Sequence, residues 1–295
     1  MHRIDTSTAQ VDKFGAGKNG FTGGNPQTGE LATALDADYF DSVQEELANV
    51  IEGAGLTLSK DSNSQLIEAI NTLVGPGRLL NIQVITATGT YTKTPGTKDA
   101  FVKGVGGGAA GGGVGASTSS SVRGGAGGGA GTYGETWIDD VPDTVAVTIG
   151  AAGVGVSGNN GGNGGTSTFG SYLTLPGGNG GNYGINMTSA GRGAAGGEIA
   201  TAATGSDFSI RGQSGDDAFS ISATTVVAGA GASTSVGEGG SCQCSTSTTG
   251  TAFTNAGIAA TGYGAGGGGA TCGIGGAANV GGNGGPGIFI VMEFA

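Results

Sequence analysis

The sequence is poor in the residues that most catalytic and metal sites require. It has one histidine, His2, and only 11% of its 295 residues are charged. A Ser–His–Asp or Cys–His pair needs a histidine held beside its nucleophile, so His2, at the flexible end, is no credible base. The cysteines Cys242, Cys244 and Cys272 do not have the spacing of a zinc site. We therefore expect no enzymatic activity, no metal and no cofactor.

Cysteine is also too scarce for a disulfide framework. The count of three is odd, so any pairing leaves one thiol over. Unpaired thiols are expected of a protein made in a reducing cytosol. A Cys242–Cys272 or Cys244–Cys272 disulfide that forms later is the alternative.

Long apolar stretches are lacking as well. Residues 1–7 contain no apolar segment of a secretory signal, and no run approaches the length of a membrane span. The net charge of −11 argues against nucleic acid or an anionic membrane as partner, because both are bound by neutralising phosphates. We expect a protein made in the cytoplasm without a signal peptide and without membrane insertion. If it works outside a cell, it leaves by a route other than standard secretion, such as lysis of a host.

Glycine, in contrast, is present in great excess, with 69 residues that lie mostly after residue 100 in short runs. Each ordered glycine costs about 0.5–1 kcal/mol relative to alanine, which over these runs reaches roughly tens of kcal/mol. A typical net stability is about 5–15 kcal/mol. The runs are therefore either disordered or ordered in a lattice that only glycine can enter. The terminal apolar run at residues 287–294 needs a core and favours order.

The glycine geometry that permits close packing is an extended helix of about three residues per turn whose backbone groups point outward. Arrays of such helices can hydrogen-bond to one another because no side chain separates them, and weak Cα–H···O contacts add to this. With six prolines and no strict glycine period, a collagen helix is excluded. We expect a polyglycine-II-type helix sandwich. Its tracts are residues 104–115, 124–134, 150–165, 177–184, 191–197, 262–276 and 281–287.

The first third of the chain has a different composition. Residues 1–35 are polar and rich in turn residues, which predicts an extended arm that orders against a partner, with Ile4, Phe14 and Phe21 as candidate attachment residues. Residues 36–77 predict a helical association segment. Its first helix is capped by Asp36 or Asp38 and ends at Gly53 or Gly55. The apolar residues of this helix recur as in a seam between helices: Phe40, Val43, Leu47 and Val50.

A second helix is predicted by the capping box Ser62-X-X-Gln65 and ends at Gly75-Pro76-Gly77. Two short helices with apolar seams do not form a stable unit alone. We infer association of copies, most simply as a homotrimer around a threefold axis, and a helical hairpin within one chain is the alternative.

Residues 78–103 predict a small β region. Residues 79–85 and 99–105 have the composition of strands, and Thr94-Pro95-Gly96-Thr97 predicts a turn between them. Further along, residues 132–138 and 144–149 predict one hairpin.

A second predicted hairpin pairs residues 166–169 with 172–175. Residues 104–295 are then a glycine-rich tip domain. The expected fold is elongated, mainly β and irregular, with the short arm and helices at its start.

Two motifs that suggest chemistry are weak. Gly106-X-Gly108-X-X-Gly111 matches a dinucleotide fingerprint, but no helix is predicted after it and chance matches are frequent in such a tract. The adjacent carboxylates Asp139–Asp140 and Asp216–Asp217 point to opposite sides of an extended chain, so turns are the better interpretation than a glycosidase pair.

The better contact candidates lie in polar excursions between the glycine tracts, at residues 116–123, 182–190, 206–223 and 241–256. Function concentrates in loops that a rigid scaffold holds. Trp137 is better explained by packing than by sugar stacking. The candidate receptor-binding residues are Tyr183, Met187, Phe208, Asp216, Asp217, Phe219 and Phe253. The alternative is that each apolar side chain pins its own loop.

The opening His2-Arg3-Ile4-Asp5-Thr6, the stretch Leu31-Ala32-Thr33-Ala34-Leu35-Asp36-Ala37-Asp38-Tyr39-Phe40 and the stretch at residues 43–52 resemble the N-terminal region of tail fibre proteins of tailed bacteriophages and prophages. The segment Thr90-Tyr91-Thr92-X-Thr94-Pro95-Gly96-Thr97 and the ending at residues 284–294 resemble their glycine-rich C-terminal domains. The resemblance covers most of the chain.

This resemblance implies a trimeric fibre of the virion, whose N-terminal arm docks on the tail or baseplate. It also implies a tip that binds an outer-membrane protein or surface glycan of the host. In design the chain is similar to glycine-rich adhesins at fibre tips of T-even-like phages, but it carries its own attachment region. A purely structural glycine-rich protein and a polysaccharide-degrading tailspike are the alternatives.

Overall fold

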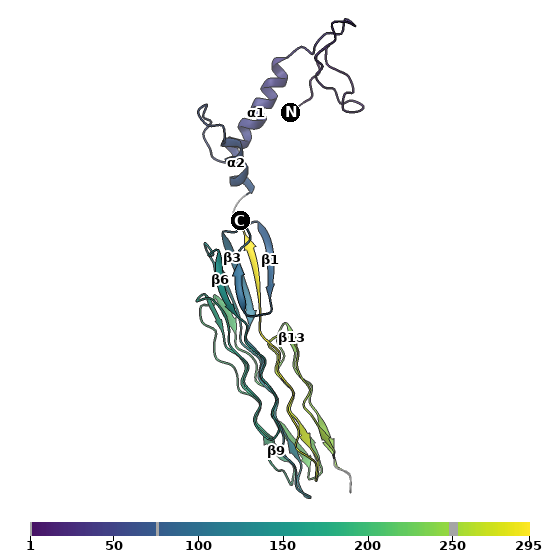
Figure 1. Cartoon of the computed structure of the whole chain (residues 1–295), viewed down its shortest axis with the longest axis vertical. Coiled ribbons are helices and arrows are strands. Elements are labelled where there is room, and N and C mark those ends of the chain that lie inside the picture. Colours follow the sequence, from purple (N-terminus) through teal and green to yellow (C-terminus); the bar gives the residue numbers. More distant parts are fainter. Residues whose placement is uncertain (1, 75–76, 248–252) are drawn as a thin grey trace. The chain divides into compact units, whose positions relative to one another are not determined.

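The computed structural model describes residues 2–74, 77–247 and 253–295, which form two compact units, residues 1–78 and 79–295 (Figure 1). The first unit contains both helices that the described residues form, and neither is long and apolar enough to cross a membrane. The second unit is mainly antiparallel β structure and glycine-rich extended segments.

The first unit begins with an irregular arm. Its turns are held by isolated bridges between Gln10 and Gly20 and between Asn25 and Glu30. Ile4 is buried within the unit, whereas Phe14 and Phe21 are exposed. The arm therefore has local order of its own, although little of it is packed.

Helix α1 (Ala37–Gly53) begins where the sequence predicts, because the Asp36 carboxylate accepts a 2.8 Å hydrogen bond from the Tyr39 amide. The predicted capping box of the second helix is wrong. Helix α2 begins at Gln65, and the Gln65 side chain is occupied by the preceding loop, since it accepts from the Ser59 amide at 2.8 Å instead of reaching Ser62. The residues Gly75 and Pro76, predicted to end α2, lie outside the described residues.

The two helices contact each other, so the helical hairpin within one chain is present in this unit. Contact between them does not cover their apolar side chains. Helix α1 has no buried residue, and α2 buries only Ala69 among its described residues. Several large apolar side chains stay exposed: Phe40, Leu47, Leu66, Ile67, Ile70, Leu73 and Val74.

The second unit is built from short strands. They are β1 Leu79–Ile85, β2 Gly89–Thr92, β3 Asp99–Val105, β4 Arg123–Gly124, β5 Tyr133–Ile138, β6 Thr144–Thr148, β7 Ser167–Phe169, β8 Leu173–Leu175, β9 Gly191–Ala194, β10 Phe208–Ile210, β11 Ala218–Ser222, β12 Thr225–Val227, β13 Gly237–Glu238, β14 Cys244–Thr246, β15 Thr254–Asn255, β16 Thr261–Gly262, β17 Thr271–Cys272 and β18 Ile288–Phe294.

Two sheets face each other at one end of this unit. The five-stranded sheet has the order β1-β18-β3-β5-β10, and the four-stranded sheet has the order β2-β6-β7-β8. The last strand, β18, therefore lies in the sheet interior between β1 and β3. The main hydrophobic core lies between the two sheets and includes Tyr91, Val102, Phe169, Leu173 and Phe289.

Strand pairing confirms one predicted hairpin and corrects another. Strands β7 and β8 pair across the turn at Gly170, as predicted. The predicted hairpin of residues 132–138 with 144–149 is wrong, because β5 and β6 belong to different sheets. Between them Val141 is buried in the core and donates its amide to Lys98 at 2.8 Å, so this turn carries the chain from one sheet to the other. The predicted turn at residues 94–97 is present, with Gly96 at φ +93°.

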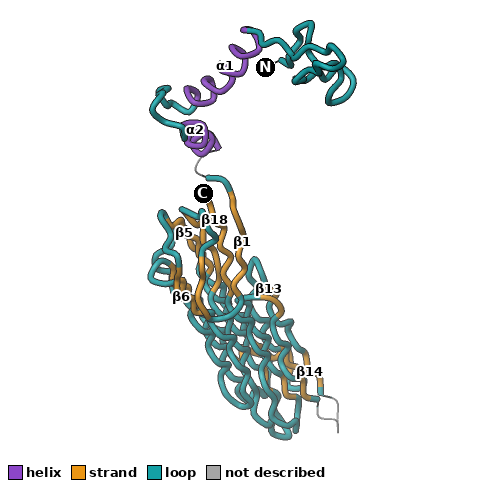
Figure 2. Tube along the Cα trace, turned by 45° about the horizontal axis from the view of Figure 1, so that its top comes forward, coloured by secondary structure: helices purple, strands orange, loops and turns teal. Residues whose placement is uncertain are grey.

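Beyond the sheets, glycine-rich segments run side by side over most of the unit (Figure 2). Residues 106–114 donate their amides in rotation to three neighbouring segments, residues 126–132, 159–165 and 279–285, at 2.8–3.0 Å. Every third donor reaches the same neighbour. Toward the second of these segments the pairs are Gly107–Gly165, Ala110–Gly162 and Gly113–Asn159. A backbone with this three-residue period forms hydrogen bonds in three outward directions, whereas a β-strand forms them in two.

The close approach of these backbones explains the excess of glycine. A Cβ atom at Gly108 would lie 1.9 Å from the carbonyl oxygen of Ala265, and one at Gly112 would lie 1.9 Å from that of Asn182. These partners are backbone atoms and cannot rotate away. Alanine also occurs in the array, as at Ala109, which is fully buried. The array is therefore ordered, as the sequence predicts, and its interior is backbone.

Candidate binding surface

The glycine-rich segments turn back through polar loops at the end of the array opposite the two large sheets (Figure 1). We call this group of loops the far end. Among the described residues it comprises 115–123, 185–193, 218–227, 244–247, 253–256 and 273–279. Two small sheets form there, one with the order β14-β12-β11-β9 and one with the order β15-β17-β4. The far end thus brings together parts of the chain that are more than a hundred residues apart.

A small apolar cluster ties these loops to one another. Val122, Met187 and Val226 are buried together, and Ile274 packs against them. The amides and carbonyls of Val122 and Met187 also exchange two hydrogen bonds of 2.9 Å. Each of the four residues comes from a different loop. The cluster therefore positions all four loops at once.

Polar contacts reinforce the same junction. The Asn186 side-chain oxygen accepts from the Ser121 hydroxyl at 2.9 Å and from Nε of Arg123 at 2.8 Å. In the neighbouring sheets, the buried hydroxyl groups of Ser245 and Thr271 lie 2.6 Å apart. These bonds join the loops through side chains that glycine could not supply.

One face of the four-stranded far-end sheet carries exposed apolar side chains. Strand β11 alternates, so that Phe219 and Ile221 are 46% and 58% exposed while Ala218 and Ser220 are buried. Phe219 stands opposite Arg192 on β9 and opposite Val227 on β12. The face is thus an aromatic and aliphatic patch beside a cation.

The Arg192 guanidinium is held in place by Asp217. Nε of Arg192 lies 2.6 Å from Oδ2 of Asp217, and its Nη2 donates to Oδ1 at 2.9 Å. This hydrogen bonding, together with a bond from the Gly196 amide, holds the pKa of Asp217 below its usual range. A bidentate pair fixes the plane of the guanidinium, which is otherwise free to rotate at a surface.

The structure brings some of the predicted receptor-binding residues together and separates others. Asp217, Phe219 and Phe253 lie in or beside the far end, and Met187 belongs to its buried cluster. Tyr183 is exposed on the adjoining array segment, where its amide donates to Asn160. Asp216 is exposed, but its backbone belongs to the array.

Phe208 lies at the opposite end, on β10 in the large five-stranded sheet, where it stands opposite Glu135. The predicted excursion of residues 206–223 is therefore not one loop. It runs from one end of the unit to the other, because residues 212–216 form part of the array. Residues 248–252 of the predicted 241–256 excursion lie outside the described residues.

The individual residues chosen from the sequence did not include Arg192, Ile185 or Ile221, which are exposed at the far end, although Ile185 and Ile221 lie within the predicted excursions. The alternation of Ala218-Phe219-Ser220-Ile221-Ser222 was a usable signal, since it is the period of a strand with one exposed face. Nothing in the sequence around Arg192 marks it, because its neighbours are glycine and alanine.

All three cysteines are free thiols. Cys242 and Cys244 are exposed and Cys272 is buried, where its sulfur lies 3.2 Å from the Ala277 carbonyl oxygen. This agrees with the expectation of three unpaired thiols.

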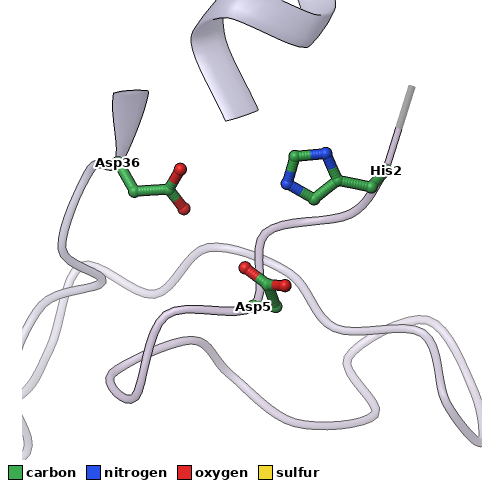
Figure 3. A group of neighbouring side chains, drawn as sticks. All are labelled: His2, Asp5 and Asp36. Atoms are coloured by element: carbon green, nitrogen blue, oxygen red, sulfur yellow. The ribbon is translucent and has the colours of Figure 1, made fainter. Parts of the chain in front are cut away.

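In the first unit, His2, Asp5 and Asp36 point toward a common space, and their possible ligand atoms all lie within 4.8 Å of one another (Figure 3). A structural zinc site takes four protein ligands, one more than this group supplies. Asp36 also caps α1. The expectation that the chain needs no metal stays a prediction.

Two similarities to known proteins cover parts of this chain. Over 74 residues the chain is 64% identical to a protein of Escherichia coli (strain K12) named Uncharacterized protein StfP, a match that covers 25% of this chain and 35% of StfP. Residues 85–292 match the glycine-rich domain family, and they include the four-stranded sheet β2-β6-β7-β8, most of the five-stranded sheet and the whole array. Because that match extends over more than half of the chain, the protein belongs to the glycine-rich domain family.

Proposed function

We propose that this chain is a tail fibre protein of a bacteriophage or prophage, which binds a receptor on the host-cell surface through the far end of its glycine-rich unit. The observation that carries the proposal is the convergence of loops from distant parts of the chain on one buried cluster, beside an exposed face formed by Phe219, Ile221 and Arg192. Aromatic and small polar residues held on a rigid support are typical of adaptable recognition surfaces.

The glycine-rich array serves as that rigid support, and we propose that it is a polyglycine-II-type helix sandwich. The three-residue rotation of its hydrogen bonds supports this assignment. Because the array holds the loops before any partner arrives, binding loses less conformational entropy than it would with free loops.

The first unit is proposed to attach the fibre to the phage tail or baseplate, and the fibre to be a homotrimer located in the virion. Phe14 and Phe21 are exposed on the arm, and the seam candidates Phe40 and Leu47 are exposed on α1, which supports contacts outside the chain. Val43 and Val50 lie partly exposed on the same helix. Several copies per virion would add avidity to a weak single contact. We propose no enzymatic role and no cofactor.

Binding of the purified, fluorescently labelled full-length chain to Gram-negative cells tests the proposal. We expect saturable binding that falls at least tenfold in a Phe219→Lys/Ile221→Lys variant. The control is Val154→Lys, since Val154 is 62% exposed on the array and is not one of the far-end residues. Abolition by mild surface proteolysis would identify a protein receptor, and resistance would identify a glycan. Equal binding by the far-end variant and the wild type would contradict the assignment of the site.

A further inference from the structure

The outward side of the five-stranded sheet β1-β18-β3-β5-β10, which we call the outer face, is apolar and uncovered. One row across it consists of Ile82 on β1, Met292 on β18, Phe101 on β3 and Trp137 on β5, which stand opposite one another in register. Trp137 is 43% exposed, and its ring lies 6.4 Å from that of Phe101. No polar residue interrupts this row.

The next row contains one charged pair, and two further carboxylates lie at the end of the face, Asp99 opposite Phe294 and Asp139, which accepts from Nε1 of Trp137 at 2.8 Å. Val84, Ile290, Lys103, Glu135 and Phe208 follow one another across the same five strands. Lys103 and Glu135 are direct cross-strand partners of opposite sign, so the row carries no net charge. At its two edges Val84 is 59% and Phe208 is 53% exposed.

The opposite side of the same sheet already packs in the main core, through residues such as Val102, Phe289 and Val291. The sequence of strand β18 is Ile-Phe-Ile-Val-Met-Glu-Phe. It lacks the alternation of apolar and polar residues expected of a strand in a sheet with one solvent-exposed face. Near-continuous apolar strands are typical of sheets that are covered on both faces. Exposed apolar patches of this extent mark interaction sites.

We infer that the outer face is a contact surface between copies of this chain. The chain carries a net charge of −11, which makes copies repel one another, and the two central rows of the outer face carry no net charge, so copies can approach there. The segment that precedes β1 presents a second uncovered apolar surface on α1 and α2. Each copy carries both surfaces, so association between copies can supply an apolar partner to each of them. The inference rests on the self-association in the proposed function and does not depend on receptor binding.

The chain contains a single tryptophan, Trp137, so its fluorescence reports directly on the outer face. The test compares the full-length wild type with a Val84→Lys/Phe208→Lys variant and with a control variant, Val154→Lys/Ile199→Lys. All four side chains are more than half exposed, so none of the substitutions removes a buried contact of the single chain. Mass is measured by light scattering, and shielding of Trp137 by acrylamide quenching.

We expect the wild type and the control to have a mass of three times 27.9 kDa with a shielded Trp137. The outer-face variant should dissociate at a concentration at least tenfold higher and show a freely quenched Trp137. A monomeric wild type would overturn both the inference and the proposed trimer. An oligomer in which Trp137 is as freely quenched as in the outer-face variant would overturn the inference and leave association through the helices in place. A dimer with a shielded Trp137 would support the inference and contradict the trimer.

Discussion

The hydroxyl group of Tyr91 donates a 2.7 Å hydrogen bond to the buried carboxylate of Glu293, which joins β2 in one large sheet to β18 in the other. The same carboxylate accepts from the amide of Thr94 at 2.9 Å, from its hydroxyl group at 2.6 Å, and from the Gln83 side chain at 3.1 Å. Burial raises the pKa of Glu293, but the hydrogen bonds from Thr94, Tyr91 and Gln83 outweigh burial and hold that pKa below its usual range. A charged group thus connects the two sheets within an otherwise apolar core.

Replacing this carboxylate should destabilise the second unit. In Glu293→Gln an NH2 group replaces one of the two oxygens that accept these hydrogen bonds, so we expect the free energy of unfolding in urea at neutral pH to fall by about 1–3 kcal/mol. Tyr91→Phe removes one of the four hydrogen bonds and should have a smaller effect. An unchanged urea midpoint in Glu293→Gln would mean that the four bonds add nothing to stability.

The effect of Glu293 should also depend on pH. Its pKa is lower in the folded than in the unfolded chain, so the stabilisation is present above the unfolded value of about 4.3 and is lost as the pH falls toward the folded value. We therefore expect the difference in stability between the wild type and Glu293→Gln to shrink between about pH 5 and pH 3. Thermal unfolding of both proteins across this range measures it, and a difference that grows on acidification would contradict the assignment.

A single methyl group inside the array should be poorly tolerated. In Gly108→Ala the new Cβ would meet the Ala265 carbonyl oxygen at 1.9 Å, and we expect a loss of about 3 kcal/mol in the free energy of unfolding. Gly191→Ala is the matched control, because no atom lies within 4 Å of its Cβ position. Similar urea midpoints for both variants would show that the array relaxes around side chains.

The buried cluster of the far end should control the order of its loops. Met187→Ala removes a buried side chain, and we expect a loss of about 2–5 kcal/mol in local stability. Hydrogen exchange of the amides of Val122 and Met187 should accelerate, since these two residues exchange backbone hydrogen bonds. Ile185→Ala, at an exposed neighbouring position, should leave their exchange rates nearly unchanged.

The three thiols should differ in reactivity. Cys242 and Cys244 are exposed, so both should react with a maleimide in the native protein, whereas buried Cys272 should react only after unfolding. Mass spectrometry of labelled peptides distinguishes the sites. A single reactive thiol under non-reducing conditions would instead indicate a disulfide to Cys272.

Local signals in the sequence predicted those parts of the fold that local interactions determine. Asp36 caps α1 as its position before an apolar repeat predicts, and the β7–β8 hairpin closes on its two-residue turn. The glycine runs predicted a backbone lattice, because no other packing suits them. These elements need no knowledge of distant partners.

The remaining features depend on contacts between distant residues. The placement of β5 and β6 in different sheets depends on the burial of Val141. The burial of Glu293 within an apolar strand depends on its hydrogen bond from Tyr91, which lies about two hundred residues earlier. Within the candidate site, Phe219 and Asp217 were found from local composition. Arg192 was not, because its role comes from a strand pairing with β11 that its own sequence does not indicate.

The hydrogen bonding of the array repeats every three residues, so it depends on the number of residues in each segment. Every third amide of residues 106–114 donates to the same neighbouring segment. If a segment gained or lost three residues, its amides would therefore still donate to the same neighbours. A change of one residue turns every following amide by a third of a turn, toward the wrong segment. The loops at the far end are not part of this three-residue repeat. They can therefore vary in length and composition while the hydrogen bonds of the array stay intact. Under the proposed function, such variation would change the receptor without a change of scaffold.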